Sequence, residues 1–348
     1  MNEKQFVPAM FLPFLLCAAP LKSTAASPAP PELKGAAVGA TVAYNSITGT
    51  FQYDYEVSNS SESTGRITSF SLDITTTPGV YPPSNGLSNT ATGYLSISSD
   101  FNAQKLTTQI LPVGIAASPA RWNCGIDSDG TVTWAQNPLS PAGLAIAPAS
   151  SLSGYALSSH APPGIRRFKV EAYVDLTLYF PGIDDLPEDQ IAQAVAAQNA
   201  ARAAAMFSGV TIGPVAPPSL TDVSSLLASL IALKHQAAGL GWLGGDEFVV
   251  ELDARLDQAA HALARDKKKL ARVRLGQFIH DLSKARESRR EAEDRRGDRH
   301  GKDKHGRRER FVSTTGFQLL AANAELIISK LPNEVEDDDA HERSRHGR

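Results

Sequence analysis

The chain contains 348 residues, of which 34 are Lys or Arg and 37 are Asp or Glu, and 42% of its residues are hydrophobic. This length predicts about two domains, and the composition excludes collagen-like, wholly disordered and disulfide-rich scaffolds. After the first thirty residues no run of 18 apolar residues occurs, which excludes a protein that crosses a membrane several times. The composition is typical of a soluble protein with more than one domain.

The N-terminus has the pattern of a secretory signal peptide over residues 1–26. Lys4 precedes an apolar run over 6–20, and small residues follow at the positions that a signal peptidase reads. We expect cleavage after Ala25 or Ala26 and export to the periplasm or the extracellular space. The alternatives are an uncleaved anchor and a buried N-terminal helix. Lipidation of Cys17 is disfavoured because Leu16, which is not small, precedes it.

If Cys17 leaves with the signal peptide, Cys124 is the one thiol of the mature chain and an intramolecular disulfide is excluded. Cys124 lies within a predicted strand over 122–126. We therefore expect a buried and inert thiol.

Charge and composition change near residue 220. Residues 28–220 carry 8 basic and 14 acidic side chains, whereas residues 221–332 carry 21 basic and 16 acidic ones. The first part is rich in Ser, Thr, Gly and Pro, and the second in Leu, Ala, Arg and Lys. This shift predicts an α+β protein in separate domains, with a β-sandwich over 36–180 and a helical domain over 219–332.

Alternation of apolar and polar residues predicts the strands of the first domain. It is clearest over 50–57, where the apolar positions are Phe51, Tyr53, Tyr55 and Val57. The turn at Gly49 joins this strand to 41–44 in a hairpin, and Asp129-Gly130 predicts a second one. Further strands are predicted over 67–74, 122–126, 131–134, 152–157 and 168–173. About seven strands with turns between them indicate an antiparallel, Ig-like β-sandwich.

Residues 181–218 depart from the strand pattern. An Ala-rich stretch follows Pro187 and predicts a helix of low amphipathicity, which we expect to lie across the sandwich. Gly and Pro are frequent over 209–218, and this composition predicts a semi-rigid linker between the domains.

Apolar residues recur at helical spacing in four segments of the second domain. The predicted helices run from near Thr221, as the N-cap, to Gly239, then over 246–265, from 267 onwards, and over 314–331. Four amphipathic helices predict a four-helix bundle-like domain. Its expected core includes Leu226, Leu230, Leu252, Leu256, Leu275, Phe278, Leu282, Leu320 and Ile327.

Two segments of this helical region are similar to a known module. Residues 275–279 (LGQFI) and 252–259 (LDARLDQA) resemble the packing motifs of the FIMAH-type helical domain of secreted bacterial proteins. Residues 49–59 and 129–134 are similar to the exported β-sandwich domains that often precede it. The resemblance covers most of residues 36–331 and implies a fold without an enzymatic activity. Gly276 replaces the usual Ala, and an insertion over 283–310 departs from the family pattern.

The sequence contains no recognisable motif for catalysis or for binding a metal or cofactor. No two histidines have helical ligand spacing among His160, His235, His261, His280, His300 and His305, so we predict no metal site and no cofactor. Residues 127–130 (DSDG) hold a fragment of a calcium loop that a hairpin turn explains equally well. No nucleophile elbow, P-loop or dinucleotide-binding motif occurs, and we predict no catalytic residue.

The insertion is strongly charged. Residues Lys284–Arg310 include twelve Lys or Arg and seven Asp or Glu, with no large apolar side chain. The composition is typical of a charged helical extension with a disordered loop, and contact with a polyanion is the alternative. We expect an acidic, disordered tail over 333–348.

These observations favour a non-enzymatic, exported structural or interaction protein whose ligand the sequence does not reveal. The alternative is a carbohydrate-binding or hydrolase-accessory protein, because β-sandwiches often bind sugars on exposed aromatic side chains. The aromatic residues that would serve are Trp122, Trp134, Tyr81, Tyr94 and Tyr155. We expect the two tryptophans to lie in the core of the sandwich instead.

Overall fold

The computed structural model describes residues 29–74, 112–117, 119, 122–126, 131–136, 144–180, 182–183, 186–215, 221–296 and 310–332. Several sequence predictions fall outside these residues. They are the signal peptide over 1–26, the turn over 127–130, Tyr81, Tyr94, His300, His305, and the tail over 333–348.

Nine strands form two antiparallel sheets with the orders β1-β2-β7-β4 and β5-β6-β3-β8-β9. The strands are β1 (Ala36–Asn45), β2 (Thr50–Asn59), β3 (Ile67–Asp73), β4 (Pro112–Ala117), β5 (Trp122–Ile126), β6 (Thr131–Gln136), β7 (Ser151–Ser159), β8 (Pro163–Ala172) and β9 (Met206–Pro214). The predicted β1–β2 hairpin is confirmed, with Val42 opposite Tyr53, and Gly49 adopts a φ of +67° in its turn.

Aromatic side chains fill the space between the two sheets. Tyr55 of β2 lies 5.7 Å from Phe70 of β3, and Phe70 lies 5.5 Å from Tyr155 of β7, measured between ring centroids. Trp134 of β6 stacks on Phe70 at 5.1 Å. The contact of Tyr55 with Phe70 joins the two sheets, so the face of β2 that carries Tyr55 points inward. The alternation in the sequence therefore predicted this face correctly.

The prediction of a linker over 209–218 is wrong for residues 209–214, which belong to β9 and pair with β8. Glycine serves close packing here. A Cβ atom on Gly209 would lie 2.6 Å from the ring of Phe168, and one on Gly213 would lie 2.9 Å from Arg166. Gly in a strand often marks such a close approach, so its frequency alone did not distinguish a strand from a linker.

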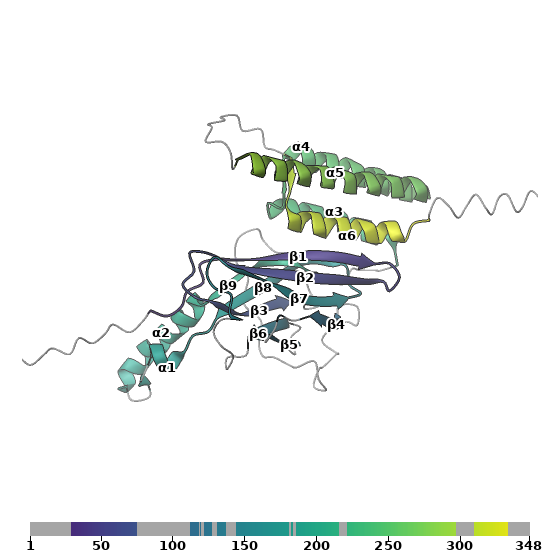
Figure 1. Cartoon of the computed structure of the whole chain (residues 1–348). Coiled ribbons are helices and arrows are strands. Elements are labelled where there is room, and N and C mark those ends of the chain that lie inside the picture. Colours follow the sequence, from purple (N-terminus) through teal and green to yellow (C-terminus); the bar gives the residue numbers. More distant parts are fainter. Residues whose placement is uncertain are drawn as a thin grey trace, which may run out of the picture.

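Five of the six helices in the described residues follow predicted segments, and the short α1 was not predicted. The six are α1 (Leu176–Tyr179), α2 (Glu188–Ala204), α3 (Val223–Gly239), α4 (Asp246–Ala264), α5 (Lys268–Arg296) and α6 (Thr314–Ser329). A short antiparallel pair, β10 (Leu243–Gly244) with β11 (Phe311–Val312), joins the segments before α4 and α6. Figure 1 shows α3 and α6 lying over β1 and β2, with α4 and α5 above them.

The N-cap of α3 is Asp222, one residue after the predicted Thr221. The Asp222 carboxylate accepts hydrogen bonds from the backbone N–H groups of Ser224 and Ser225, both at 3.1 Å, and from the Ser225 hydroxyl. These bonds hold the pKa of Asp222 below its ordinary value, with the Ser225 hydroxyl as the largest cause. An aspartate in this place satisfies two helix N–H groups that would otherwise lack partners.

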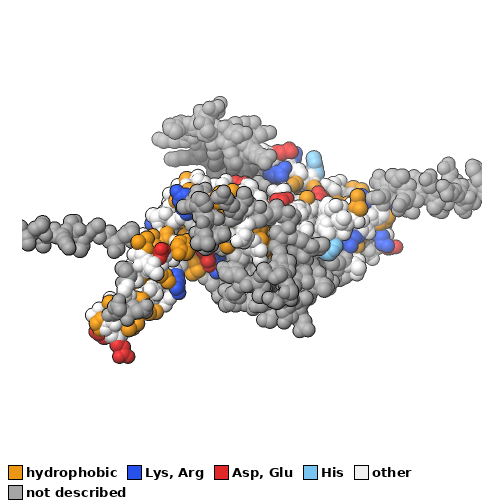
Figure 2. All heavy atoms as spheres, turned by 60° about the horizontal axis from the view of Figure 1, so that its bottom comes forward, with side chains coloured by type: hydrophobic (Ala, Val, Ile, Leu, Met, Phe, Trp, Pro, Cys, Tyr) orange, Lys and Arg blue, Asp and Glu red, His pale blue; other side chains and the backbone are white. Residues whose placement is uncertain are grey.

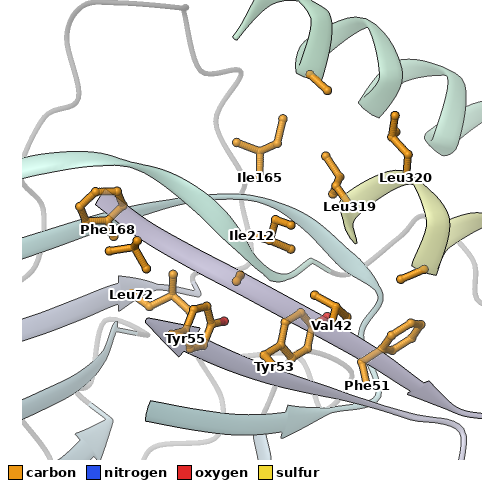
Figure 3. Close-up of a cluster of buried hydrophobic side chains, with 14 of the residues drawn as sticks. Val42, Phe51, Tyr53, Tyr55, Leu72, Ile165, Phe168, Ile212, Leu319 and Leu320 are labelled. Atoms are coloured by element: carbon orange, nitrogen blue, oxygen red, sulfur yellow. The ribbon is translucent and has the colours of Figure 1, made fainter. Parts of the chain in front are cut away.

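Helix α6 joins the helices to both sheets, since it contacts β1 of the first sheet and β8 and β9 of the second. The Gln318 side-chain oxygen accepts the backbone N–H of Val42 at 3.1 Å, and the Asn323 amide donates to the Pro163 carbonyl at 2.8 Å. The Gln318 bond satisfies a backbone N–H of β1, which is an edge strand. Apolar side chains of both layers pack here, as Figure 3 shows for Val42, Ile165, Ile212, Leu319 and Leu320.

Within the described residues, no helix combines the length and the apolar character that crossing a bilayer requires.

Candidate functional site

The aromatic residues proposed for sugar binding lie inside the protein where the structure describes them. Trp122, Trp134 and Tyr155 are 4%, 0% and 0% exposed. Tyr155 lies 5.2 Å from Trp122 and 6.0 Å from Trp134 between ring centroids. The prediction that both tryptophans lie in the core is confirmed, and these three side chains form no exposed aromatic face.

The buried tyrosines are structural. The Tyr53 hydroxyl donates to the Ala161 carbonyl at 2.7 Å, whereas the hydroxyls of Tyr55 and Tyr155 have no hydrogen-bond partner among the described residues. Burial raises the pKa of all three phenols above the ordinary value. They therefore stay neutral at physiological pH, and none is tuned for proton transfer.

Cys124 is partly buried rather than fully enclosed. Burial raises the pKa of its thiol to about 12, against a smaller opposing contribution from the backbone of Gly125. Because the thiolate is the reactive form, a thiol with this pKa is unreactive near neutral pH. The structure thus supports the expectation of an inert thiol.

Histidines occupy separate places in the fold. The Nδ1 atom of His160 lies 3.1 Å from the Gly49 carbonyl oxygen, beside the β1–β2 turn. The Nε2 atom of His235, on α3, lies 3.5 Å from a carboxylate oxygen of Asp253 on α4. In the described parts of the chain, no group of three or more His, Cys, Asp or Glu side chains is arranged to hold a metal ion.

A buried ion pair connects α3 and α4. The side chain of Lys234 is fully buried, and its ammonium pairs with Asp253, whose side chain is 32% exposed. Removal of either side chain should destabilise the fold, because it leaves the other charge uncompensated at the interface between α3 and α4. The pair links the two helices, and sequence periodicity did not predict it.

One element projects from the compact part of the molecule. We call residues 173–205, which contain α1 and α2, the arm. The arm is inserted between two neighbouring strands, since β8 ends at Ala172, β9 begins at Met206, and the Ala172 N–H donates to the Ala205 carbonyl at 2.8 Å. Figure 1 shows the arm extending away from the sheets, so α2 does not lie across them as predicted.

The first turn of the arm is held by a local cap. Asp175 accepts hydrogen bonds from the Thr177 hydroxyl at 2.7 Å, the Thr177 N–H at 3.0 Å and the Leu178 N–H at 3.2 Å. These bonds lower the pKa of the exposed Asp175 carboxyl, the Thr177 hydroxyl having the largest effect. The cap orders a turn that would otherwise have little to stabilise it.

The arm exposes apolar side chains. Of the eight large hydrophobic residues that stand out as exposed in the described chain, four lie on it: Tyr173 (63%), Leu178 (53%), Ile191 (37%) and Val195 (42%). Figure 2 shows hydrophobic side chains along the projecting arm. Sequence reasoning identified the helix but not this surface. The low amphipathicity of α2 could have indicated this exposure, because the helix has no continuous apolar face that would pack against the core.

The start of the charged insertion contributes to packing. Ala285 is 4% exposed, and the Arg286 guanidinium lies 4.1 Å from the centroid of the Phe317 ring on α6. The first residues of Lys284–Arg310 therefore pack against the helical core rather than lying free of it. Helix α5 continues to Arg296, and residues 297–309 lie outside the described chain. Contact with a polyanion stays a prediction.

No family model matches the chain, and no curated protein matches it.

Proposed function

We propose that this is an exported, non-enzymatic interaction protein that makes its principal contact through the arm. In this proposal the two sheets form an Ig-like β-sandwich, and α3 to α6 form a four-helix domain of the FIMAH type. The observation that carries the proposal is the exposure of Tyr173, Leu178, Ile191 and Val195 on one projecting element. Apolar surface gathered in this way marks interaction sites.

The arm has the position of an accessory element. Its two ends meet at the Ala172–Ala205 hydrogen bond, and β8 and β9 already pair over their full length without it. Replacement of residues 173–204 by Asn-Gly would close β8 and β9 with a two-residue turn. We expect this arm-less variant to fold, because Ala201 is the one buried residue of α2.

Comparison of the intact and arm-less proteins tests the proposal. Both would be applied to an array of bacterial surface glycans and polymers, and both would be incubated with the same polymers to detect released products. We expect no released product, and any protein or polymer contact that the intact chain makes should be lost in the arm-less variant. Polymer cleavage by the intact protein, or equal binding by both, would overturn the proposal.

Export is tested separately. Mass spectrometry of the protein recovered from outside the cytoplasm should find a chain that begins at Ala26 or Ser27, as the signal-peptide pattern predicts. An intact Met1 on exported material would contradict this part of the proposal.

A further inference from the structure

We propose that α2 is a self-association element, which pairs antiparallel with α2 of a second copy of this chain. This inference rests on the proposed role of the arm as the contact element and names its partner.

Helix α2 packs against the rest of the described chain only near its C-terminal end, where Ala201 is buried and the Ala204 carbonyl accepts the Leu33 N–H at 2.8 Å. Its 17 residues include a single buried one, Ala201, and its N-cap, Pro187, makes no side-chain capping bond. Most helices in proteins owe their stability to packing of one face against a neighbour rather than to intrinsic propensity. A second helix against the exposed face of α2 would supply what the chain itself does not.

The charges of α2 specify the direction of pairing. Glu188 and Asp189 occupy its first turn, and Arg202 lies in its last turn. Parallel pairing would bring like charges together, whereas antiparallel pairing places the acidic end of each helix beside the basic end of the other. The helix dipoles also favour antiparallel pairing, because the partly positive N-terminus of each helix then lies beside the partly negative C-terminus of the other.

Residues on one face of α2 are arranged symmetrically about Val195. Glu188 and Arg202 each lie seven residues from it, which is about 10 Å along a helix axis, and residues at this spacing share a face. Ile191 and the exposed Asn199 lie four residues to either side. A two-fold axis at Val195 therefore places Val195 against its copy and Glu188 opposite Arg202 of the copy.

This geometry favours a second copy over an unrelated partner. A symmetric contact uses one patch twice, and here the patch is complementary to itself. The contact area of two helices of this length is below that of stable dimers, so we expect a weak, concentration-dependent association.

Disulfide trapping tests the register. In a full-length protein with Cys17→Ser and Cys124→Ser, Val195→Cys would be oxidised with copper phenanthroline at high micromolar concentration. We expect a covalent dimer, because the two introduced thiols face each other across the axis. The matched control is Ala197→Cys, which is also exposed but lies on the opposite face of α2. Equal trapping at both positions, or none at position 195, would overturn the proposal.

Charge exchange tests the direction. Glu188→Arg and Arg202→Glu should each weaken self-association about tenfold in sedimentation velocity, since each replaces two attractive contacts by two repulsive ones. A mixture of the two variants should form heterodimers, in which every contact is attractive again. If both variants self-associate as strongly as the unmodified protein, antiparallel pairing is contradicted.

The two proposals fail in different ways. If the intact chain is monomeric at all concentrations but its binding to the polymer array still depends on the arm, self-association is overturned and the arm remains the contact element. If the arm-less variant self-associates as strongly as the intact chain, both proposals are wrong.

Discussion

Helices α6 and α2 have nearly the same length, yet they have opposite environments. Nine of the 16 residues of α6 are buried, against one of the 17 residues of α2. The difference lies in the large side chains. Helix α6 carries three leucines and two isoleucines, whereas α2 carries Ile191 and Val195 among alanines and polar residues.

The comparison shows that helix formation and helix packing are separate questions. Alanine gives α2 the higher intrinsic propensity, since it has eight alanines against three in α6. The leucines of α6 remove apolar area from water in the core, and α2 has too little apolar area to do so within one chain. Substitutions in α6 should therefore change the stability of the whole protein, and matched substitutions in α2 should not.

The largest expected effect comes from Leu320 in α6, which is fully buried in the apolar core. Leu320→Ala should lower the free energy of unfolding by about 2–5 kcal/mol, the usual cost of a core truncation. The matched change Val195→Ala in α2 should stay within about 0.5 kcal/mol. Chemical denaturation of the three proteins measures both values.

The same experiment bears on whether the two domains fold separately, as the sequence predicts. Separate fragments over 28–208 and 219–332 would test this, but a break after residue 208 removes most of β9. A break after residue 215 keeps it. If Leu320→Ala shifts one shared transition that includes the sheets and the helices, separate folding is wrong.

The second effect concerns the polar contact between α6 and β8. Asn323→Ala removes the donor to the Pro163 carbonyl and leaves that buried oxygen without this bond. We expect a loss of about 1–3 kcal/mol, the cost of an unsatisfied buried polar group. Asn199→Ala in α2 is the control and should cause no loss in thermal denaturation, because Asn199 is exposed. Equal effects would show that α6 is not held at this point.

The third effect depends on pH and concerns α3, the neighbour of α6. The pKa of Asp222 is lowered in the folded state, so its stabilising contribution is present above the unfolded pKa and is lost as pH falls through the folded pKa. Between pH 6 and pH 2.5 the intact protein should lose more stability than Asp222→Asn does. Melting temperatures at several pH values measure this, and parallel acid limbs would contradict it.

The smallest effect would sharpen the comparison by improving α2. Pro187→Ser introduces a capping side chain where the helix now has none. Hydrogen exchange should show slower exchange of the amides in the first turns of α2, while the melting temperature of the whole protein stays unchanged. A higher melting temperature would mean that α2 unfolds together with the sheets.

Local patterns of the sequence predicted most of the secondary structure. The alternation of Phe51, Tyr53, Tyr55 and Val57 placed β2 and its inward face, and leucine spacing placed α3 to α6 within a few residues. These predictions succeeded because a strand repeats every two residues and a helix every 3.6, and a buried face imposes that period on the sequence.

The tertiary structure alone decided which surfaces meet. Gly209 and Gly213 belong to a strand because Phe168 and Arg166 occupy the space of their missing side chains, and a composition of Gly and Pro does not reveal that neighbour. The pairing of Lys234 with Asp253 and the contact of α6 with β1 likewise join residues far apart in the chain. The arm is exposed for the same reason, since burial depends on what lies opposite a helix and not on its own period.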